Sequence, residues 1–394
     1  MRRSSLLLVV AIVAISLNLR PPIAGIGPLV QEIRLDTGLS NTLLGLLTTL
    51  PLIAFGVFSV WTASISKRIG TEITMGLALL LVASGTLLRV IPFHLALFGG
   101  TLVLGIGIAL GNTLLPGITK KHFPKRFGQI TGIYAATLGL GAALASGISV
   151  PLSEGLGWGW RWAVGVWGFV ALTALLIWFP FMKRSRPEIR TTSMRDSLKR
   201  LGRSSAAWHV SLFMGFQSFT FYVIIAWLPD ILTEQGMSPL VAGWMLFLTQ
   251  IVGVTATLFI PAWAAGRHDQ VVPVWLILSC ELIGVAGLTA GLLIPVLIQT
   301  GWVILWASLI GVSLGSTFGL ALLFIGLRTR DNETANELSG TSQSIGYTLA
   351  AIGPALFGAM HDATGSWILP LLFLFTIGVS KLASGLLAAR NRMV

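Results

Sequence analysis

An arginine followed by two prolines interrupts the first long apolar stretch of the chain. The sequence around Arg20 reads ISLNLRPPIAG, so the charge directly precedes Pro21 and Pro22. Residues 5–19 would form a helix of about 22 Å, too short for a bilayer core of roughly 30 Å, whereas residues 5–30 would reach about 39 Å. Arg20 must therefore lie inside the membrane. A charge at this depth is costly, and such residues commonly contact a solute or an ion.

The two prolines predict a break in the helix beside this charge. Their nitrogens cannot donate hydrogen bonds, so the carbonyls of Leu17 and Asn18 lose their helical partners, and the residue before a proline is pushed away from helical geometry. Irregular backbone at this depth is tolerated only where it is packed in protein or lines a watery cavity. We expect Arg20 to face such a cavity and to bind a solute. The alternative is that Arg20 pairs with a buried group and only braces the helices.

Other apolar stretches carry polar side chains at a similar depth. These are amides and phenols: Asn112, Tyr134, Gln217, Tyr222, Gln250, Gln343 and Tyr347. Taken singly, each fits a hydrogen bond between helices better than a ligand contact. As a set they suit a small, flat, polar or anionic molecule, because amides and an arginine satisfy its heteroatoms while aromatic rings cover its faces.

Two residues of opposite charge lie well inside later apolar stretches. Glu281 and Lys381 fall at similar depths from the same side of the membrane. This placement predicts a structural ion pair between two peripheral helices. The alternative is that Glu281 carries a coupling proton.

The composition indicates that membrane-spanning helices position these residues. The 394 residues are 54% hydrophobic and 10% charged, whereas soluble domains carry about 25% charged residues. Breaks at charged or Gly/Pro-rich positions leave stretches that are each long enough to cross a bilayer. We expect an all-α membrane protein with twelve spans, near residues 5–31, 41–65, 72–90, 94–118, 128–152, 158–181, 207–230, 239–264, 271–295, 300–327, 335–360 and 365–389.

The basic residues indicate the orientation of these spans. Of the 26 Lys and Arg residues, 21 fall on the side that contains the N-terminus, and Arg34, Arg89 and Arg161 fall on the other. Because basic loops stay in the cytoplasm, we expect both termini there. The net charge of +12 is thus a topology signal, and we expect no nucleic-acid binding.

The sequence gives no support for catalysis or metal binding. The one cysteine, Cys280, lies within an apolar stretch. No nucleophile, base and orienting group can be assembled, and no His, Cys or carboxylate cluster has the spacing of metal ligands. We expect no enzyme, no metal and no cofactor.

The two halves of the chain resemble each other. The segment RLDTGLSNTLLGLLTTL (34–50) is echoed by LTEQGMSPLVAGWMLFL (232–248), with two glycines seven positions apart in each. Two parallel six-helix repeats are typical of transporters whose bundles rock about a site at the bilayer midplane. We therefore expect pseudo-symmetric six-helix bundles over residues 1–182 and 207–394, joined by a cytoplasmic linker over residues 183–206.

Four stretches resemble the major facilitator superfamily and, within it, the branch of cyanate permeases and nitroimidazole exporters. They are GLLTTLPLIAFGVFS (45–59), GGTLVLGIGIALGNTLLPGITKKHFP (99–124), YVIIAWLPDIL (222–232) and LSGTSQSIGYTLAAIGPALFGAMHDATGSW (338–367). The resemblance covers essentially the whole chain, and it implies that spans 1, 4, 7 and 10 line the cavity. The superfamily signature Gly-x-x-x-Asp-Arg-x-Gly-Arg-Arg survives only as SKRIGTE. Arg68 and Gly70 match it, but Lys67 replaces the Asp on which a gating ion pair depends.

These features predict a secondary transporter that works by alternating access. Gly353 and Pro354 in the eleventh span predict a bend that can flex during transport. The resemblance implies export of a nitroimidazole-like solute, with uptake of cyanate or another small anion as the alternative and a non-transporting membrane sensor as a remote one. We expect a monomer in the inner membrane of a bacterium. Its expected partners are a small-molecule substrate, the lipid bilayer and a proton as coupling ion.

Overall fold

The computed structural model describes residues 3–123, 127–183, 202, 204–329 and 332–390, and every regular element in these ranges is helical. Eleven of the described helices are long and apolar enough to cross a membrane. One more, α14 (Asn332–Thr364), has 33 residues and a polar first half, and it measures about 50 Å. The expected all-α membrane protein is confirmed. Most of the expected linker over residues 183–206 lies outside the described residues.

The chain forms two compact units. One consists of Met1–Leu39 and Leu46–Thr191, and the other of Ser40–Gly45 and Thr192–Val394. In the first unit the later helices are α4 (Asn41–Ile69) from Leu46 onward, α5 (Thr71–Leu88), α6 (His94–His122), α7 (Phe127–Val150) and α8 (Gly159–Met182). A short π-helical turn at Pro151–Gly155 precedes α8.

The first membrane span is built from four consecutive helical pieces. They are α1 (Arg3–Asn18), α2 (Pro21–Ala24), the 3-10 turn η1 (Gly27–Leu29) and α3 (Val30–Thr37). The sequence predicted an end near residue 31, but helical backbone continues to Thr37. Gly38 then ends the helix in the left-handed conformation at φ 67°, which a glycine adopts without a steric penalty.

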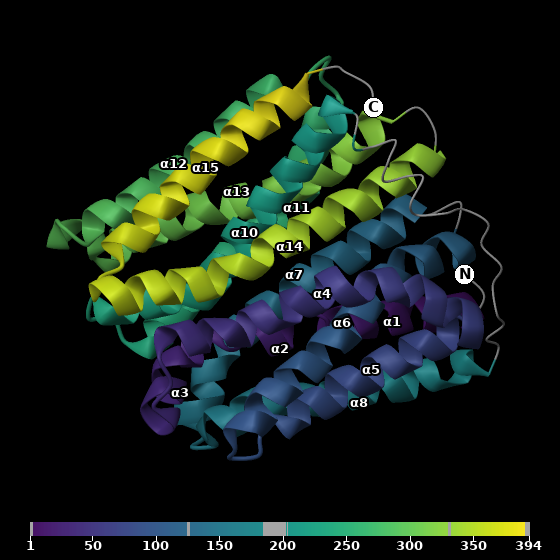
Figure 1. Cartoon of the computed structure of the whole chain (residues 1–394), viewed down its shortest axis with the longest axis horizontal. Coiled ribbons are helices and arrows are strands. Elements are labelled where there is room, and N and C mark those ends of the chain that lie inside the picture. Colours follow the sequence, from purple (N-terminus) through teal and green to yellow (C-terminus); the bar gives the residue numbers. More distant parts are fainter. Residues whose placement is uncertain (1–2, 124–126, 184–201, 203, 330–331, 391–394) are drawn as a thin grey trace. The chain divides into compact units, whose positions relative to one another are not determined.

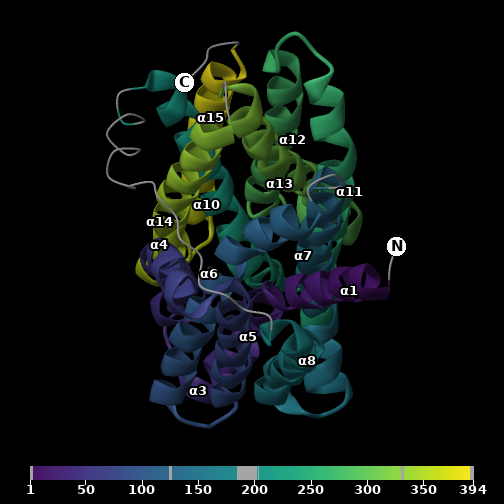
Figure 2. The same cartoon turned by 90° about the vertical axis from the view of Figure 1, so that its right-hand side faces the viewer.

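Small residues let the helices of the first unit pack closely. α5 lies against α6 and α8, and α7 lies against α1 and α2 (Figures 1 and 2). A Cβ on Gly85 of α5 would collide with the backbone of Gly100 and Leu104 on α6. A Cβ on Gly107 would lie 2.6 Å from the carbonyl oxygen of Ala78. Close backbone approach of this kind is how membrane helices associate without a hydrophobic driving force.

The second unit packs its helices in the same manner. α10 (Ser205–Glu234) lies against α14 and α15 (Ile368–Ala389), and α12 (Val271–Gly291) lies against α15 and α13 (Thr300–Leu327) (Figure 1). α11 (Pro239–Ala265) crosses α13 where backbone meets backbone, because a Cβ on Gly315 would overlap the carbonyl of Gly253.

Short polar side chains mark where the helices of the second unit begin. The Oγ atoms of Ser204 and Ser238 accept hydrogen bonds of 3.3 Å from the N–H groups of Ala207 and Val241. These are N-caps, which satisfy donors that have no partner inside the helix. Gly236, which the sequence repeat pairs with Gly38, follows α10 at φ 89°.

Residues 40–45 belong to the second unit, where Asp362 of α14 caps the start of α4. Its carboxylate accepts hydrogen bonds from the N–H of Asn41 (3.1 Å), the N–H of Thr42 (2.8 Å) and the hydroxyl of Thr42 (2.7 Å). Burial raises the pKa of the Asp362 carboxyl, but the hydrogen bonds from Thr42 and Asn41 outweigh burial and hold the pKa below its usual value. The neighbouring His361 ring bridges the side chains of Asn41 and Glu234, at 3.0 and 3.1 Å.

Candidate functional site

Arg20 lies at the break in the first span, between α1 and α2. It is the N-cap residue of α2 with φ −121° and ψ −34°, and its carbonyl accepts hydrogen bonds from the N–H groups of Ile23 (3.1 Å) and Ala24 (3.0 Å). Its side chain is half-buried, whereas Pro21 and Pro22 are buried. The prolines thus put a charged residue on non-helical backbone within an otherwise apolar span.

Side chains from other helices donate to carbonyls of the irregular stretch that follows Arg20. Nη1 of Arg89 donates to the Pro22 carbonyl at 2.7 Å, and the Ser149 hydroxyl on α7 donates to the Gly25 carbonyl at 3.1 Å. Gly141 on α7 lies beside the carbonyl of Leu17, where a Cβ would come within 2.8 Å of the oxygen. Such compensation from packed protein is what makes irregular backbone tolerable in a membrane.

Arg89 is the residue that sequence reasoning missed. Its position beside the end of the third stretch indicated an outer loop, but its side chain is only 1% exposed. It is the C-cap residue of α5 and turns back toward α2. The only local signal is Gly85 one turn earlier, which marks the close approach of α5 and α6 but not the direction of the arginine.

The remaining predicted residues of the first unit lie on separate helices. Asn112 on α6 and Tyr134 on α7 are both half-buried. Gly111, next to Asn112, faces the first span, because a Cβ there would lie 2.8 Å from Cδ2 of Leu19. At the far end of α4 the side chain of Arg68 is exposed, and the side chain of Lys67 lies outside the described residues.

In the second unit the structure brings some of the predicted polar residues together. The Tyr222 ring on α10 and the Tyr347 ring on α14 have centroids 6.4 Å apart. Gln217 is 3% exposed, and its side-chain carbonyl accepts a 3.1 Å hydrogen bond from the Ser218 hydroxyl. Gln250 on α11 is 5% exposed, and its Nε2 has no hydrogen-bond partner among the described residues.

Gln343, Gly353 and Pro354 all lie on α14. Gln343 is half-buried. A Cβ on Gly353 would lie 2.9 Å from Cγ2 of Val223, so α14 approaches α10 closely there. The Pro354 carbonyl accepts a 2.8 Å hydrogen bond from Nε1 of Trp227. α14 stays helical through the proline.

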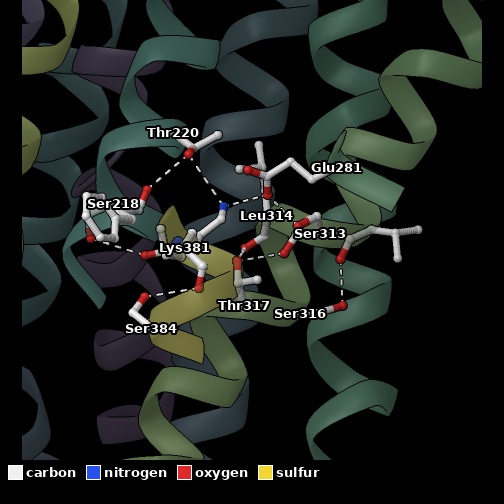
Figure 3. A network of polar contacts seen from close by, with 12 residues as sticks. Ser218, Thr220, Glu281, Ser313, Leu314, Ser316, Thr317, Lys381 and Ser384 are labelled. Atoms are coloured by element: carbon white, nitrogen blue, oxygen red, sulfur yellow. Dashed lines mark hydrogen bonds and ion pairs between the residues drawn. The ribbon is translucent and has the colours of Figure 1, made fainter. Parts of the chain in front are cut away.

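Glu281 and Lys381 lie in contact between α12 and α15. The Lys381 ammonium is 2.5 Å from Oε2 of Glu281, and the side chains are 0% and 1% exposed for Lys381 and Glu281. The Ser313 hydroxyl on α13 also donates to Oε2, at 2.5 Å, and the Thr220 hydroxyl on α10 lies 3.5 Å from the ammonium. Figure 3 shows the ammonium between Glu281 and Thr220, so this one network joins four helices.

The described residues contain no group of three or more His, Cys, Asp or Glu side chains that could hold a metal ion. What the geometry provides is a half-buried arginine on broken helix backbone, a second arginine behind the break, and hydrogen-bonding side chains on surrounding helices. These groups can bind and orient a polar or anionic solute by hydrogen bonds and charge.

Comparisons with known proteins agree with this architecture. The family model described as Major Facilitator Superfamily matches residues 6–358. The chain is 39% identical to the uncharacterized transporter YycB of Bacillus subtilis (strain 168), over 98% of this chain and 94% of that protein. It is 38% identical to the 2-nitroimidazole transporter of Escherichia coli (strain K12), over 100% of this chain and 98% of that protein. It is 28% identical to the cyanate transport protein CynX of the same strain, over 93% of each.

Two solved structures share the fold at low sequence identity. A bacterial homolog of the human lysosomal transporter Spinster has a TM-score of 0.77 and 16% identity, and the match covers 99% of this chain and 98% of that one. A D-xylose-proton symporter has a TM-score of 0.75 and 14% identity over 100% of both chains.

Proposed function

Because the chain belongs to the Major Facilitator Superfamily and is a multi-pass secondary transporter, we propose that it moves a small heterocyclic or anionic solute across the cytoplasmic membrane of a bacterium. The proposed direction is export, the mechanism is alternating access, and the transporting unit is a monomer. The 38% identity to a 2-nitroimidazole transporter supports the heterocycle. Uptake of a cyanate-like anion is the alternative, which the 28% identity to CynX supports.

One observation carries the proposed substrate class: Arg20 lies on a helix break inside the first span. A guanidinium carries its N–H donors in a planar fork, whose geometry matches a carboxylate, a nitro group or another planar acceptor. Because the break displaces Arg20 from regular helix geometry, its carbonyl and side chain are presented differently from those of a residue in the middle of a helix. We propose that Arg20 makes the main polar contact with the solute.

The buried pair between Glu281 and Lys381 is proposed to be structural. Both groups are almost completely enclosed, and the ammonium lies against Oε2 of the carboxylate, while Oε1 has no hydrogen-bond partner among the described residues. A proton that is carried through the transport cycle has to enter and leave its site, whereas a closed pair of this kind holds helices in register. The energy source proposed is an ion gradient across the membrane.

The first experiment measures ligand-dependent thermal stabilisation of the purified protein in detergent. The panel contains 2-nitroimidazole, cyanate, nitrate and neutral imidazoles. A ligand that binds the folded protein raises Tm, and the stabilisation grows with the logarithm of one plus the ratio of ligand concentration to Kd. We expect one compound to stabilise the wild type but not Arg20→Gln. The matched control is Arg267→Gln, which removes a charge from the exposed end of α11 and should keep the full shift.

The outcomes test the proposed substrate class and the proposed role of Arg20 separately. If no compound stabilises the wild type, the proposed substrate class is wrong. If the shift survives in Arg20→Gln, the arginine only braces the helices. Direction follows from comparing uptake of the stabilising compound into everted and right-side-out membrane vesicles, because an exporter loads only the everted ones.

A further inference from the structure

Arg89 is a buried cation that forms no ion pair with a carboxylate of the described residues. Its side chain is 1% exposed, and Nη1 makes one hydrogen bond, to the Pro22 carbonyl. Nε and Nη2 are buried without a hydrogen-bond partner among the described residues. A buried guanidinium is usually paired with an anion, because leaving its donors unmatched is expensive. The open donors of Nε and Nη2 make the charge at this site costly for local stability.

Three described carboxylates of the first unit are engaged elsewhere, and a fourth, Glu154, is exposed. Glu32 accepts hydrogen bonds from the Ser153 hydroxyl and the Trp160 N–H, Asp36 pairs with Arg161, and Glu72 pairs with Lys121. None of the described carboxylates forms an ion pair with Arg89. Its charge consequently acts on its surroundings without compensation by a local partner.

Hydrogen bonding alone does not call for a charge at this position. The carbonyl of Gly25, three residues after Pro22, is satisfied by the neutral hydroxyl of Ser149, and that of Ala24 lies 3.5 Å from the hydroxyl of Ser146. A neutral donor would serve Pro22 equally well. What Arg89 adds beyond these serines is a positive charge held behind the break.

The guanidinium of Arg89 lies close to the backbone that carries Arg20. It is 2.7 Å from the Pro22 carbonyl, and Pro22 is two residues from Arg20, no more than about 7 Å along the chain. Gly100 lies against the stem of Arg89, where a Cβ would come 3.0 Å from its Cγ, so the arginine is packed in a fixed place.

We propose that Arg89 is a specificity-determining positioning residue, which holds the helix break and supplies a second positive charge that makes the Arg20 site select anionic solutes over neutral ones. It acts through Pro22 and through its field, without touching the solute. This inference rests on the proposed function, because it assumes that a solute binds at Arg20. For any two unit charges about 10 Å apart at an effective dielectric constant of about 20, the interaction changes an affinity roughly tenfold, and we take this as the expected size of the effect.

The test compares two ligands of the same shape and different charge, imidazole-4-carboxylate and imidazole-4-carboxamide. Dissociation constants are measured by titration of the purified full chain. The readout is the Kd of the carboxamide divided by the Kd of the carboxylate. We expect Arg89→Lys to keep the wild-type ratio within about threefold and Arg89→Gln, which retains a donor for the Pro22 carbonyl, to lower it roughly tenfold. Arg161→Gln is the control, because that charge is already neutralised by Asp36 and should leave the ratio unchanged.

An unchanged ratio in a folded Arg89→Gln overturns the proposal and leaves Arg89 as a brace. Arg89→Met is a second neutral variant, suited to apolar surroundings. If neither neutral variant folds, Arg89→Lys decides: a retained ratio supports the role of charge, and a lost one contradicts it. Failure of the proposed function looks different, because then the wild type binds neither ligand, or binds them independently of Arg20.

Discussion

The two units hold a buried positive charge in opposite ways. In the second unit the Lys381 ammonium lies against the Glu281 carboxylate, with hydroxyl groups of Ser313 and Thr220 around the pair. In the first unit the guanidinium of Arg89 has one hydrogen-bond partner within the described part of the chain, the Pro22 carbonyl. The lysine and glutamate together are neutral, so their field falls away within a short distance, whereas the field of the arginine persists.

This difference separates a charge that organises helices from a charge that acts on something else. A buried pair depends on both of its members, since removal of either strands the other in a medium that cannot solvate it. A lone cation depends on the packing that encloses it, and its removal strands only a neutral carbonyl. The variants below test whether the two sites respond in these two ways.

The largest effect is expected at the paired site. Glu281→Gln and Lys381→Met should each lower the free energy of unfolding by about 3–5 kcal/mol, because each leaves an uncompensated buried charge. The double variant should lose less than the two single losses combined. Thermal unfolding of the wild type, the two single variants and the double variant completes this double-mutant cycle. If Glu281→Gln instead leaves stability intact and removes only the pH dependence of transport, Glu281 carries a coupling proton and the structural role is wrong.

A smaller change in stability is expected at the lone cation. Arg89→Gln should alter the free energy of unfolding by less than about 2 kcal/mol, because the unmatched donors of Nε and Nη2 are removed together with the charge. The comparison uses the same thermal unfolding assay. If Arg89→Gln lowers the free energy of unfolding as much as Lys381→Met does, Arg89 contributes to stability as much as a member of the buried pair.

Removal of the neutral hydroxyls at the break should lower the free energy of unfolding by a still smaller amount. Ser149→Ala leaves the Gly25 carbonyl without its donor and should cost about 1 kcal/mol. Ser146→Ala is the matched control on the same helix, since its contact with Ala24 is longer, at 3.5 Å. Equal losses for the two variants would show that these serines contribute through packing and not through the carbonyls of the break.

The smallest effect is expected at Asp362, a carboxylate that caps a helix at an exposed position. Asp362→Asn should cost up to about 1 kcal/mol. Because the folded-state pKa of Asp362 is depressed, its contribution is complete above the usual carboxyl pKa near 4 and disappears as the pH falls through the lower folded value. Unfolding scans of the wild type and Asp362→Asn between pH 3 and 7 should therefore converge at the acid end.

Local chemistry explains which features the sequence could predict. A helix break beside Pro21 follows from a missing N–H, and close packing at Gly107 follows from a missing side chain, so both are properties of single residues in an apolar stretch. The hydrophobic pattern likewise predicts spans without knowledge of their neighbours. The end of the first span near residue 31 was wrong because Gln31, Glu32 and Arg34 are polar, yet tertiary partners such as Ser153 keep the helix intact.

The inward turn of Arg89 could not be predicted, because it depends on helices far away in the sequence. A charged residue at the end of an apolar stretch usually lies in a loop, and nothing near Arg89 in the sequence says that a carbonyl 67 residues earlier needs a donor. Similarly, the sequence names Gln217 and Gln250 as polar residues within spans but does not say which partners they meet. Those answers come from how the helices of each unit are arranged.

The dependence of the first span on α7 also bears on how the protein is inserted into the membrane. The hydroxyl that satisfies the Gly25 carbonyl belongs to Ser149, 124 residues later in the chain. When the first span leaves the ribosome, that serine has not been synthesised, and an open carbonyl facing lipid costs several kcal/mol. We therefore expect the first span to stay within the insertion machinery until α7 arrives, so that a nascent chain that stops before Phe127 remains bound there.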